Sequence, residues 1–464
     1  MSICKITSYN PANPSQVIAE YEVEPVLRIP EKIEESRRAG FAWSTVSVSE
    51  RVSKLSELLN LLKSSELQLA QCISLEMGKP INQSIQEVRD SIDEAGFLLS
   101  RAEEVLSETH IGYDSSSHHY RSWVALGVVA VIAPWNYPLE LSLWGILGAL
   151  LAGNGVIYKP SEQSPLVGQT LFDLLFQLDI PPGLIQIVHG DRTQGIALVE
   201  ASVDCIWFVG STEAGLDIYQ RASRSLKKCL LEMGGSSPGI ILEGTAITEN
   251  LVREILASRL TNTGQVCSAI KRLFVHESLH DQIIEYLGHF LSEWIPADPL
   301  DLNTNIGPVA TKVGLLRLKE AIYDAKSKGA SHFSVECVLP EDGFYFPPTI
   351  ITGATRSMKV MAQEIFGPLL PVVKFCTTNE AIHLANDTNY GLSAVIYGSE
   401  SDQLKYLASK IEAGRVCLNS AKGTDIKYSF ECFKDSGLGC CQGDALLSEF
   451  ALMKYTRLHI SQRG

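Results

Sequence analysis

The sequence predicts an α/β protein of more than one domain, in which a parallel β-sheet carries helices on both faces. Short apolar runs between residues 128 and 233 alternate with helix-length amphipathic segments, and strands joined by helical crossovers form parallel sheets. Runs such as VVAVIA and CIWFV are apolar throughout, which indicates burial on both faces. A chain of 464 residues also exceeds what one hydrophobic core usually supports. The predicted strands are 128–133, 156–159, 185–189, 205–209 and 228–233.

The segments on either side of this sheet are assigned from their periodicity. The first hundred residues are predicted to be helical, because leucines such as Leu55, Leu58 and Leu62 recur at helical spacing. A second α/β segment is expected after residue 235, where strands and helices alternate again. Residues 118–125 and 455–460 are predicted as peripheral strands, and such exposed edges invite pairing with another subunit.

Composition and charge argue against several classes of function. The net charge is −14 and no run is rich in Lys or Arg, so neither a nucleic acid nor an anionic membrane is expected as a partner. The most apolar stretch, 128–158, is interrupted by prolines, glycines and Glu140, which favours a buried strand–helix–strand over a membrane span. The amino terminus lacks the apolar core of a secretory signal. Eleven scattered cysteines fit a reducing compartment, so a cytoplasmic location is expected.

A distinctive polar loop follows each of the five predicted strands. Ligands of open parallel sheets bind beyond the carboxyl ends of the strands, so a nucleotide or dinucleotide is expected at this edge. No complete G-x-G-x-x-G motif occurs, and the helix start in GSTEAG would offer backbone N–H groups to a pyrophosphate instead. The loops are APWNYP (133–138), KPSEQSP (159–165), HGDRTQG (189–195), VGSTEAG (209–215) and LEMGG (231–235).

Three residues could carry chemistry, although each also has a plain structural interpretation. Cys267 lies in the polar turn of LTNTGQVCSAIKR, where exposure near backbone donors would favour the reactive thiolate; most cysteines, as expected for Cys205 and Cys417, are small core residues. Glu232 closes a buried strand, either as a general base or as a capping or ion-paired group. Asn136 could donate to an oxyanion or simply be a turn residue.

Seven segments, in the same order along most of the chain, together resemble the aldehyde dehydrogenase superfamily. This resemblance implies a three-layer cofactor domain with a parallel sheet, an α/β catalytic domain and a small β flap for oligomerisation. The implied divisions are 1–107 with 126–234 for NAD(P) binding, 235–445 for catalysis, and 108–125 with 446–464 for oligomerisation. The segments are APWNYP, KPSEQSP, FVGSTEAG (208–215), LEMGGSSP (231–238), NTGQVCSA (262–269), EIFGPLLPV (364–372) and NDTNYGLSAVIYG (386–398).

The resemblance implies oxidation of an aldehyde to the carboxylic acid, with NAD or NADP as acceptor. In that scheme Cys267 forms a thiohemiacetal and then a thioester, while Asn136 and the Cys267 backbone N–H stabilise the oxyanion. Glu232 then activates the water that hydrolyses the thioester. Relatives that pass the acyl group to coenzyme A lack this glutamate, so release of the free acid is favoured. Glu162 favours NAD slightly, because a carboxylate suits free ribose hydroxyls.

The same resemblance implies the residues that hold the two small molecules. Lys159 and Glu162 resemble the adenosine-ribose contacts, residues 210–211 the pyrophosphate loop, and Glu364 and Phe366 the flank of the nicotinamide. No metal is expected, and assembly into a homodimer or homotetramer is. The implied cofactor contacts are Ala133, Pro134, Trp135, Lys159, Ser161, Glu162, Gly190, Phe208, Gly210, Ser211, Met233, Gly234, Glu364 and Phe366. The implied substrate pocket is Tyr137, Trp144, Thr261, Val266 and Phe430.

One departure from the family pattern concerns the substrate. The wording of several segments is closest to bacterial succinate-semialdehyde dehydrogenases, which hold the substrate carboxylate with arginines. Trp144 and Thr261 stand at the matching positions, and both changes remove charge. Succinate semialdehyde is therefore expected to be a poor substrate, and an aliphatic or aromatic aldehyde suits Trp144 better.

A second departure lies in SFECFKDSGLGCC (429–441). Glu431 and Cys432 replace two family glycines, and Cys440 and Cys441 replace an Arg-Glu pair that helps to organise the site, so turnover could differ. The cysteines are interpreted as packing residues, with metal or redox ligands as the alternative. A catalytically weak dinucleotide-binding relative and a cofactor-independent thiol esterase are the competing functions, and cofactor-dependent turnover separates them.

Overall fold

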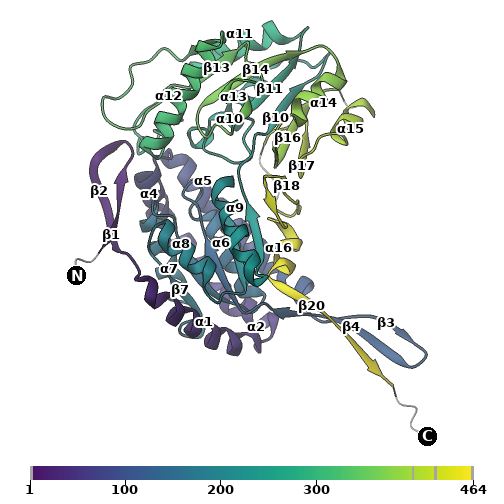
Figure 1. The fold of residues 1–464 in the computed structure, drawn as a ribbon. Coiled ribbons are helices and arrows are strands. Elements are labelled where there is room, and N and C mark those ends of the chain that lie inside the picture. Colours follow the sequence, from purple (N-terminus) through teal and green to yellow (C-terminus); the bar gives the residue numbers. More distant parts are fainter. Residues whose placement is uncertain (1–3, 400–401, 423–425, 461–464) are drawn as a thin grey trace.

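The computed structural model describes residues 4–399, 402–422 and 426–460, which form two α/β lobes and a projecting β-arm (Figure 1). The first lobe is built on a six-stranded sheet of order β19-β9-β8-β5-β6-β7. Neighbours from β9 to β7 pair in parallel, and β19 adds an antiparallel edge. The parallel sheet predicted from the five apolar runs is confirmed. Its strands are β5 Val128–Ile132, β6 Gly155–Lys159, β7 Ile185–Ile187, β8 Cys205–Val209, β9 Lys228–Glu232 and β19 Gly437–Leu438.

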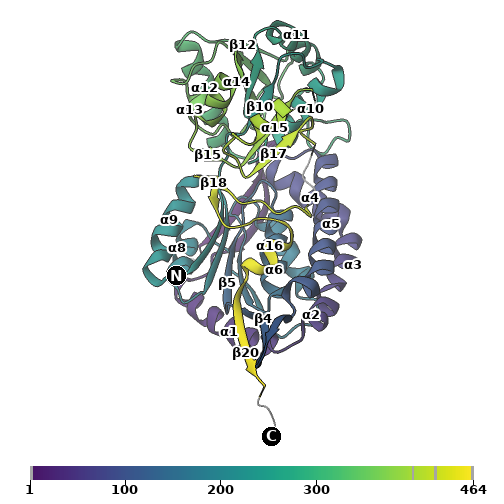
Figure 2. The same ribbon diagram turned by 90° about the vertical axis from the view of Figure 1, so that its right-hand side faces the viewer.

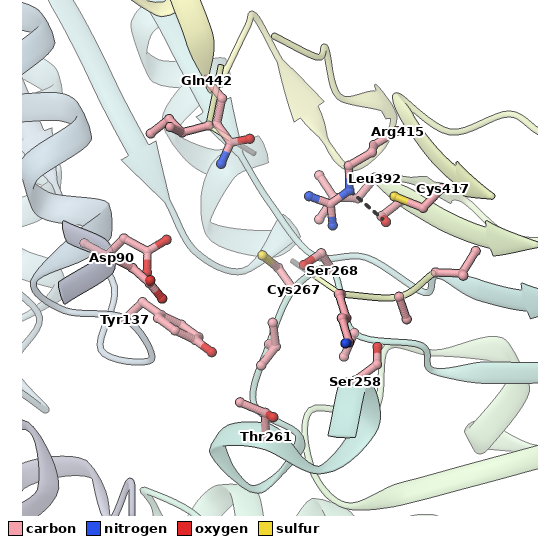
Figure 3. Close-up of a pocket in the computed structure, with 18 of the residues that line it drawn as sticks. Asp90, Tyr137, Ser258, Thr261, Cys267, Ser268, Leu392, Arg415, Cys417 and Gln442 are labelled. Carbon is pink, nitrogen blue, oxygen red and sulfur yellow. Dashed lines mark hydrogen bonds between the residues drawn. The ribbon is translucent and has the colours of Figure 1, made fainter. Parts of the chain in front are cut away.

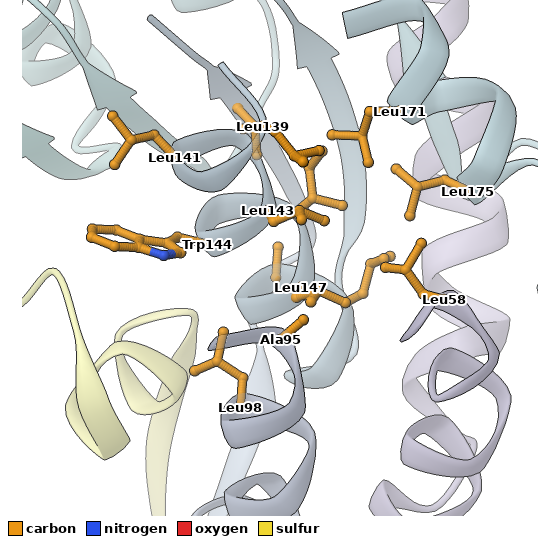
Figure 4. Packing of buried hydrophobic residues seen from close by; sticks show 14 of the residues in the cluster. Leu58, Ala95, Leu98, Leu139, Leu141, Leu143, Trp144, Leu147, Leu171 and Leu175 are labelled. Atoms are coloured by element: carbon orange, nitrogen blue, oxygen red, sulfur yellow. The ribbon is translucent and has the colours of Figure 1, made fainter. Parts of the chain in front are cut away.

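Both faces of this sheet are buried, as the continuous apolar runs predicted. Val129 and Val131 of β5 pack into a cluster with helices α5 and α6, whereas Val128 and Ala130 pack with Ile29 and other residues of the opposite face. Figure 4 shows the first of these clusters, in which leucines from several helices of this lobe pack together. The helices of the lobe are α1 Ile29–Ser44, α2 Val48–Leu55, α3 Glu57–Ser64, α4 Glu66–Met77, α5 Ile81–Leu106, α6 Glu140–Leu151, α7 Pro165–Leu175, α8 Arg192–Glu200, α9 Thr212–Ala222 and α16 Gly443–Glu449.

The amino terminus differs from the expectation that the first hundred residues are helical. β1 Lys5–Asn10 and β2 Asn13–Glu22 form an antiparallel hairpin before the helices begin. The turn is stabilised by Asn10, whose Oδ1 accepts a hydrogen bond from the Ala12 backbone at 2.9 Å, a local contact typical of Asn in turns. Pro11 in the same turn accepts from the Phe344 backbone at 2.9 Å, so the hairpin ties the start of the chain to the second lobe.

The second lobe contains a seven-stranded sheet of order β12-β13-β14-β11-β10-β16-β17. Its neighbours are parallel except at β12, which pairs antiparallel with β13. Apolar clusters cover both faces, as in the first lobe. The strands are β10 Pro238–Ile241, β11 Arg272–His276, β12 Ser331–Ser334, β13 Thr349–Thr352, β14 Leu369–Phe375, β16 Ser393–Tyr397 and β17 Arg415–Leu418. The helices are α10 Glu249–Leu260, α11 His280–Leu291, α12 Lys312–Ser327, α13 Lys359–Ala362, α14 Thr378–Asn386 and α15 Asp402–Ala408, and the 3-10 turns of the whole chain are η1 Val26–Arg28, η2 Ser223–Ser225 and η3 Thr261–Gly264.

The chain crosses between the lobes twice. It leaves the first lobe after β9 and returns through the segment that departs from the family pattern. There β18 Phe433–Lys434 pairs with β15 Tyr390–Gly391 of the second lobe, and β19 pairs with β9 of the first. The predicted boundary at 234/235 falls directly after β9. Residues 429–441 therefore bridge the two lobes.

The β-arm extends away from both lobes (Figures 1 and 2). β20 Ala451–His459 pairs antiparallel with β4 Ser117–Ala125 along its whole length, and β4 pairs with β3 Thr109–Asp114. These strands fall within the segments predicted to mediate oligomerisation, of which residues 461–464 lie outside the described residues. The exposed apolar side chains of the arm include Ile111, Tyr113, Val124, Leu452, Met453, Tyr455 and Leu458.

Candidate active site

Cys267 is held in a tightly bonded turn between η3 and β11. Asn262 and Thr263 adopt left-handed backbone angles, with φ of 52° and 54°, and Gly264 follows at 75°. Such angles are costly for residues other than glycine, and here the side chains offset the cost. Asn262 Nδ2 donates to the backbone oxygens of Asn136, at 2.9 Å, and Gln265, at 3.2 Å. The turn thereby places the Cys267 loop against the loop that follows β5.

Asn136 faces the same loop from the end of β5. Its Nδ2 donates to the Gln265 backbone oxygen at 3.1 Å, and the residue is 6% exposed. An amide nitrogen carries two hydrogens, so one remains free after this bond. The backbone N–H of Cys267 makes no hydrogen bond with any described residue. Two donors in the adjoining loops thus have a hydrogen that no described residue accepts.

Glu232 meets Cys267 from the carboxyl end of β9. The Cys267 Sγ donates to Glu232 Oε1 at 3.0 Å, while Glu232 Oε2 is buried and has no hydrogen-bond partner among the described residues. Burial raises the pKa of Glu232, and the hydrogen bond from Cys267 and the positive charges of Arg415 and Lys271 oppose that shift. A carboxylate with a raised pKa and a free oxygen is suited to accept a proton.

The surroundings of Cys267 differ from the predicted exposed turn. The residue is half-buried, and burial together with the adjacent charge of Glu232 raises the pKa of its thiol well above the ordinary value. The resting sulfur is therefore a thiol that hydrogen-bonds to a carboxylate. Lys271 partly opposes this shift, and its Nζ donates to the backbone oxygens of Gly235 (2.8 Å) and Cys267 (2.7 Å) and to Glu364 Oε1 (2.6 Å).

A cavity of about 760 Å³ opens on one side of Cys267 (Figure 3). Glu232 lines this cavity together with Cys267, and the close-up shows Tyr137 and Thr261 among the other lining residues. The structure thus brings together every residue of the implied substrate pocket. Those residues are Tyr137, Trp144, Thr261, Val266 and Phe430.

One wall of this cavity is acidic, a feature that the expectation of an aliphatic or aromatic aldehyde beside Trp144 did not include. Helix α5 contributes Asp90, Asp93 and Glu94, and α6 contributes Glu140. Glu94 Oε2 accepts a hydrogen bond from Trp144 Nε1 at 2.5 Å, whereas the side chains of Asp93 and Glu140 make no hydrogen bond or ion pair with the described residues. Burial and the neighbouring carboxylates raise the pKa of Glu94 to about 8.

The opposite wall carries basic residues that sequence reasoning also missed. Arg415 of β17 extends towards Cys267 (Figure 3), and its Nε donates to Ser393 Oγ at 3.3 Å. Lys422 and Arg253 line the same cavity, but Arg253 is paired with Glu293. Among the lining residues of the described chain six are acidic and three are basic, so the cavity is acidic as a whole.

A second cavity of about 600 Å³ opens on the other side of Cys267. Two glycines of its wall pack tightly against neighbouring side chains, because a Cβ on Gly234 would lie 2.2 Å from Glu364 Oε2 and one on Gly210 would lie 2.4 Å from the Phe208 ring. Its wall includes the start of α9, where backbone N–H groups favour an anion. This combination fits an extended ligand with phosphates. The implied cofactor residues that line it are Pro134, Trp135, Gly210, Ser211, Met233, Gly234, Glu364 and Phe366.

The remaining implied cofactor residues lie near this cavity, at the carboxyl ends of β5, β6, β7 and β8. Glu162 lines an adjoining cavity of about 550 Å³ that shares Trp135 with the second one. Lys159 Nζ lies 3.7 Å from Glu162 Oε2, and burial lowers the pKa of this lysine. Phe208 supports Gly210 from beneath. Those outside both cavities are Ala133, Lys159, Ser161, Gly190 and Phe208.

Comparisons with known proteins agree with this architecture. Residues 2–456 match the family model described as the aldehyde dehydrogenase family. Aminoaldehyde dehydrogenase 1, peroxisomal, of Pisum sativum is 32% identical, covering 92% of this chain and 86% of its own. Aldehyde dehydrogenase [NAD(P)+] 1 of Saccharomyces cerevisiae is 31% identical, covering 98% and 90%. A betaine aldehyde dehydrogenase variant of Staphylococcus aureus, solved with NAD⁺, superimposes with a TM-score of 0.93 at 27% identity, covering 99% and 95%.

The chain therefore belongs to the aldehyde dehydrogenase family. The family match and the homologues, which cover nearly the whole chain, support NAD(P)-dependent oxidation of an aldehyde as its general activity. The α/β fold predicted from the sequence is confirmed by the solved relatives. In the part of the chain that the structure describes, no helix has the length and apolar character to cross a membrane.

Proposed function

We propose that this chain oxidises an aldehyde to the free carboxylic acid through a thioester on Cys267. The observation that carries the proposal is the 3.0 Å hydrogen bond from Cys267 Sγ to Glu232 Oε1. It lies between two cavities for which Cys267 is the shared lining residue within the described chain. A nucleophile and its base are thus already paired where an aldehyde from one cavity and a cofactor from the other would meet.

The first step uses the contacts around the sulfur. Glu232 accepts the thiol proton as Cys267 Sγ bonds to the carbonyl carbon, and the carbonyl oxygen becomes an oxyanion. The free hydrogen of Asn136 Nδ2 and the unbonded N–H of Cys267 would stabilise that oxyanion. Because the thiol pKa is raised before substrate binds, the sulfur stays protonated and unreactive until the proton passes to Glu232.

The cofactor belongs in the second cavity. A bound nicotinamide dinucleotide would accept the hydride that the adduct loses. The glycines at 210 and 234 leave room for the ligand, the start of α9 would hold the pyrophosphate, and Glu364 and Phe366 would flank the nicotinamide. We favour NAD over NADP, because the carboxylate of Glu162 lies beside the adjoining cavity and suits free ribose hydroxyls.

Glu232 also serves the last step, after it has released the thiol proton to solvent. The thioester is hydrolysed by a water molecule that a general base deprotonates, and Glu232 Oε2 has no partner among the described residues that would compete for that proton. The same scheme supports the domain division given above: 1–107 with 126–234 would bind the cofactor and 235–445 would supply the nucleophile.

The test is cofactor-dependent turnover in a cysteine variant. We expect Cys267→Ala to abolish formation of reduced cofactor from an aldehyde while cofactor binding remains, because the sulfur and not the cavity is removed. Cys417→Ala is the matched control, since Cys417 lines the same cavity, and it should keep turnover. Undiminished turnover in Cys267→Ala would overturn the proposal. Cofactor binding without turnover in the wild type would favour the weak dinucleotide-binding alternative, and cofactor-independent ester hydrolysis the thiol esterase.

Within that function we propose that the preferred substrate is an aldehyde carrying a positive charge. This preference is supported by the acidic wall of Asp90, Asp93, Glu94 and Glu140. A cation bound beside crowded carboxylates reduces their mutual repulsion and so stabilises their charged form. Two of the relatives are named aminoaldehyde dehydrogenase and betaine aldehyde dehydrogenase, and these names denote aldehydes that carry an amino or ammonium group. A dicarboxylic substrate such as succinate semialdehyde would meet like charges on that wall, although Arg415 lies opposite.

Substrate competition tests the preference. We expect kcat/KM for an aminoaldehyde to exceed that for an uncharged aldehyde of equal length, and succinate semialdehyde to be the poorest of the three. Asp93→Asn combined with Glu140→Gln should reduce the advantage of the aminoaldehyde and leave the uncharged aldehyde nearly unaffected. An equal or higher kcat/KM for succinate semialdehyde would contradict the proposal and point to Arg415 as the carboxylate ligand.

A further inference from the structure

Two cysteines meet in the segment that bridges the lobes. Cys432 Sγ and Cys441 Sγ lie 3.6 Å apart, next to an antiparallel bridge between Glu431 and Cys440. Cys440 takes no part in this contact, because its Sγ is directed to the backbone oxygens of Phe430, at 3.2 Å, and Gln442, at 3.5 Å. The segment therefore presents a pair of thiols rather than a cluster of three. No group of three or more His, Cys, Asp or Glu in the described ranges could hold a metal ion.

We propose that Cys432 and Cys441 form a reversible disulfide when the enzyme meets a peroxide. Peroxide oxidises the Cys432 thiol to a sulfenic acid and is itself reduced to water. The Cys441 sulfur then bonds to the Cys432 sulfur, and the sulfenic oxygen leaves as a second water with the Cys441 proton. The protein loses two hydrogen atoms and two electrons in total, and a dithiol reductant restores both thiols by exchange.

The order of the two thiols follows from their exposure. Cys432 is half-buried, whereas Cys441 is 2% exposed, so peroxide reaches Cys432 first and Cys441 resolves the sulfenic acid. The hydrogen bond with Cys432 and burial raise the pKa of the Cys441 thiol, which keeps Cys441 from reacting directly. A disulfide needs an S–S distance of about 2.05 Å, so the sulfurs must approach further within a segment already folded back on itself.

The bond would act on the substrate cavity. Phe430 and Gln442 flank the two cysteines and line that cavity. Between the cysteines, Ser436 anchors the segment to both lobes: its Oγ donates to the Gly234 oxygen at 2.8 Å and accepts from the Gly391 N–H at 2.9 Å. Drawing the cysteines together while Ser436 stays fixed shifts the cavity wall. We expect KM for the aldehyde to rise severalfold, with cofactor affinity unchanged.

Intact-mass and peptide analysis test the disulfide without relying on activity. The full chain carrying Cys267→Ser, which removes the other reactive sulfur at the site, is treated with hydrogen peroxide. We expect a mass loss of two hydrogens, reversed by dithiothreitol. Trypsin then separates residues 428–434, whose one cysteine is Cys432, from residues 435–454, which hold Cys440 and Cys441, and the disulfide should join these peptides. Added Cys441→Ser should abolish the cross-link and added Cys440→Ser should retain it.

Two results would overturn the proposal. Oxidation that stops at sulfenic or sulfinic acid on Cys432, with no joined peptides, would show that Cys441 cannot reach it. Persistence of the cross-link in Cys441→Ser would assign the bond to Cys440. The link to the cavity is tested separately in the enzyme that retains Cys267, by comparing peroxide-treated wild type with peroxide-treated Cys441→Ser. A dithiothreitol-reversible rise in KM confined to the wild type is expected, and equal KM values would reject that link.

Discussion

The central contact of this enzyme is a thiol that donates to a carboxylate, and the pKa of each of these two groups lies above its ordinary value. Burial is the largest cause for both Cys267 and Glu232. A conventional thiolate nucleophile is stabilised by nearby positive charge, but here Lys271 only partly opposes the negative charge of Glu232. The sulfur is consequently activated by loss of its proton to Glu232 rather than by prior ionisation.

Replacing the carboxylate tests both steps that depend on it. Glu232→Gln keeps the shape but cannot accept a proton, so we expect the attack of Cys267 and the hydrolysis of the thioester each to slow by about 10²–10⁴-fold, the usual contribution of a general base. Rapid mixing should then show a slowed first turnover that yields at most one equivalent of reduced cofactor, followed by very slow steady-state turnover. In the wild type, turnover should fall as the pH drops through the raised pKa of Glu232, because the protonated carboxyl is no base. A normal steady state in Glu232→Gln would show that another group deprotonates the water.

At the scale of elements, helix α5 brings acidic side chains to the substrate cavity, although no sequence motif in this helix indicates that it does. Its buried face packs on α6 through residues such as Ala95 and Leu98, and its amino-terminal half carries Asp90, Asp93 and Glu94 to the cavity. These acids recur on one side of the helix because residues three and four apart share a face. The helix could be predicted from its periodicity, but its acidic face could be assigned to the cavity only from the tertiary packing.

The raised pKa of Glu94 predicts a pH-dependent substrate preference. Glu94 gains its charge as the pH rises through about 8, while an aliphatic amine, with an ordinary pKa of about 10.4, stays protonated. The ratio of kcat/KM for an aminoaldehyde to that for a matched uncharged aldehyde should therefore increase across this range. Initial rates in both substrates over a pH series measure the ratio. Glu94→Gln serves as the control and should flatten the profile; a profile that is flat in the wild type would remove Glu94 from the recognition of substrate.

The same scale shows which parts of the fold could be predicted from the sequence. Strands β5 to β9 were predictable because their apolar runs are continuous and end in distinctive loops, and Cys267, Glu232 and Asn136 lie in or beside those loops. The hairpin of β1 and β2 was missed, since it is stabilised by a turn at Asn10 and by contact with the second lobe. Arg415 was missed because nothing near it in the chain indicates that β17 ends at the cavity.

At the scale of the whole molecule, the β-arm exposes apolar side chains that no part of the same chain covers among the described residues. The arm of β3, β4 and β20 extends apolar side chains such as Tyr113, Leu452 and Leu458 into solvent, and such exposure usually marks a surface that another protein covers. We propose that the arm binds a second copy of this chain, which would give the homodimer or homotetramer expected from the sequence.

Charged substitutions in the arm test this assembly. Leu452→Asp with Leu458→Asp should yield monomers, measured by light scattering during size-exclusion chromatography, because two buried carboxylates would oppose association. The unfolding temperature of each lobe should change little, since both residues lie outside the hydrophobic clusters. Val338→Asp, at a solvent-exposed position away from the arm, is the matched control. An unchanged oligomer in the double variant would place the subunit interface elsewhere.

The position of Cys267 between the two cavities has a consequence for the binding and release of ligands. Within the described chain the two cavities share this one lining residue, so under the proposed function an aldehyde and a dinucleotide would occupy separate spaces that meet at the sulfur. The acid and the reduced cofactor would then leave from different cavities, so neither product would block the release of the other. A compound that fills one cavity would leave the other cavity open. An inhibitor that occupied both cavities would have to extend past Cys267 Sγ.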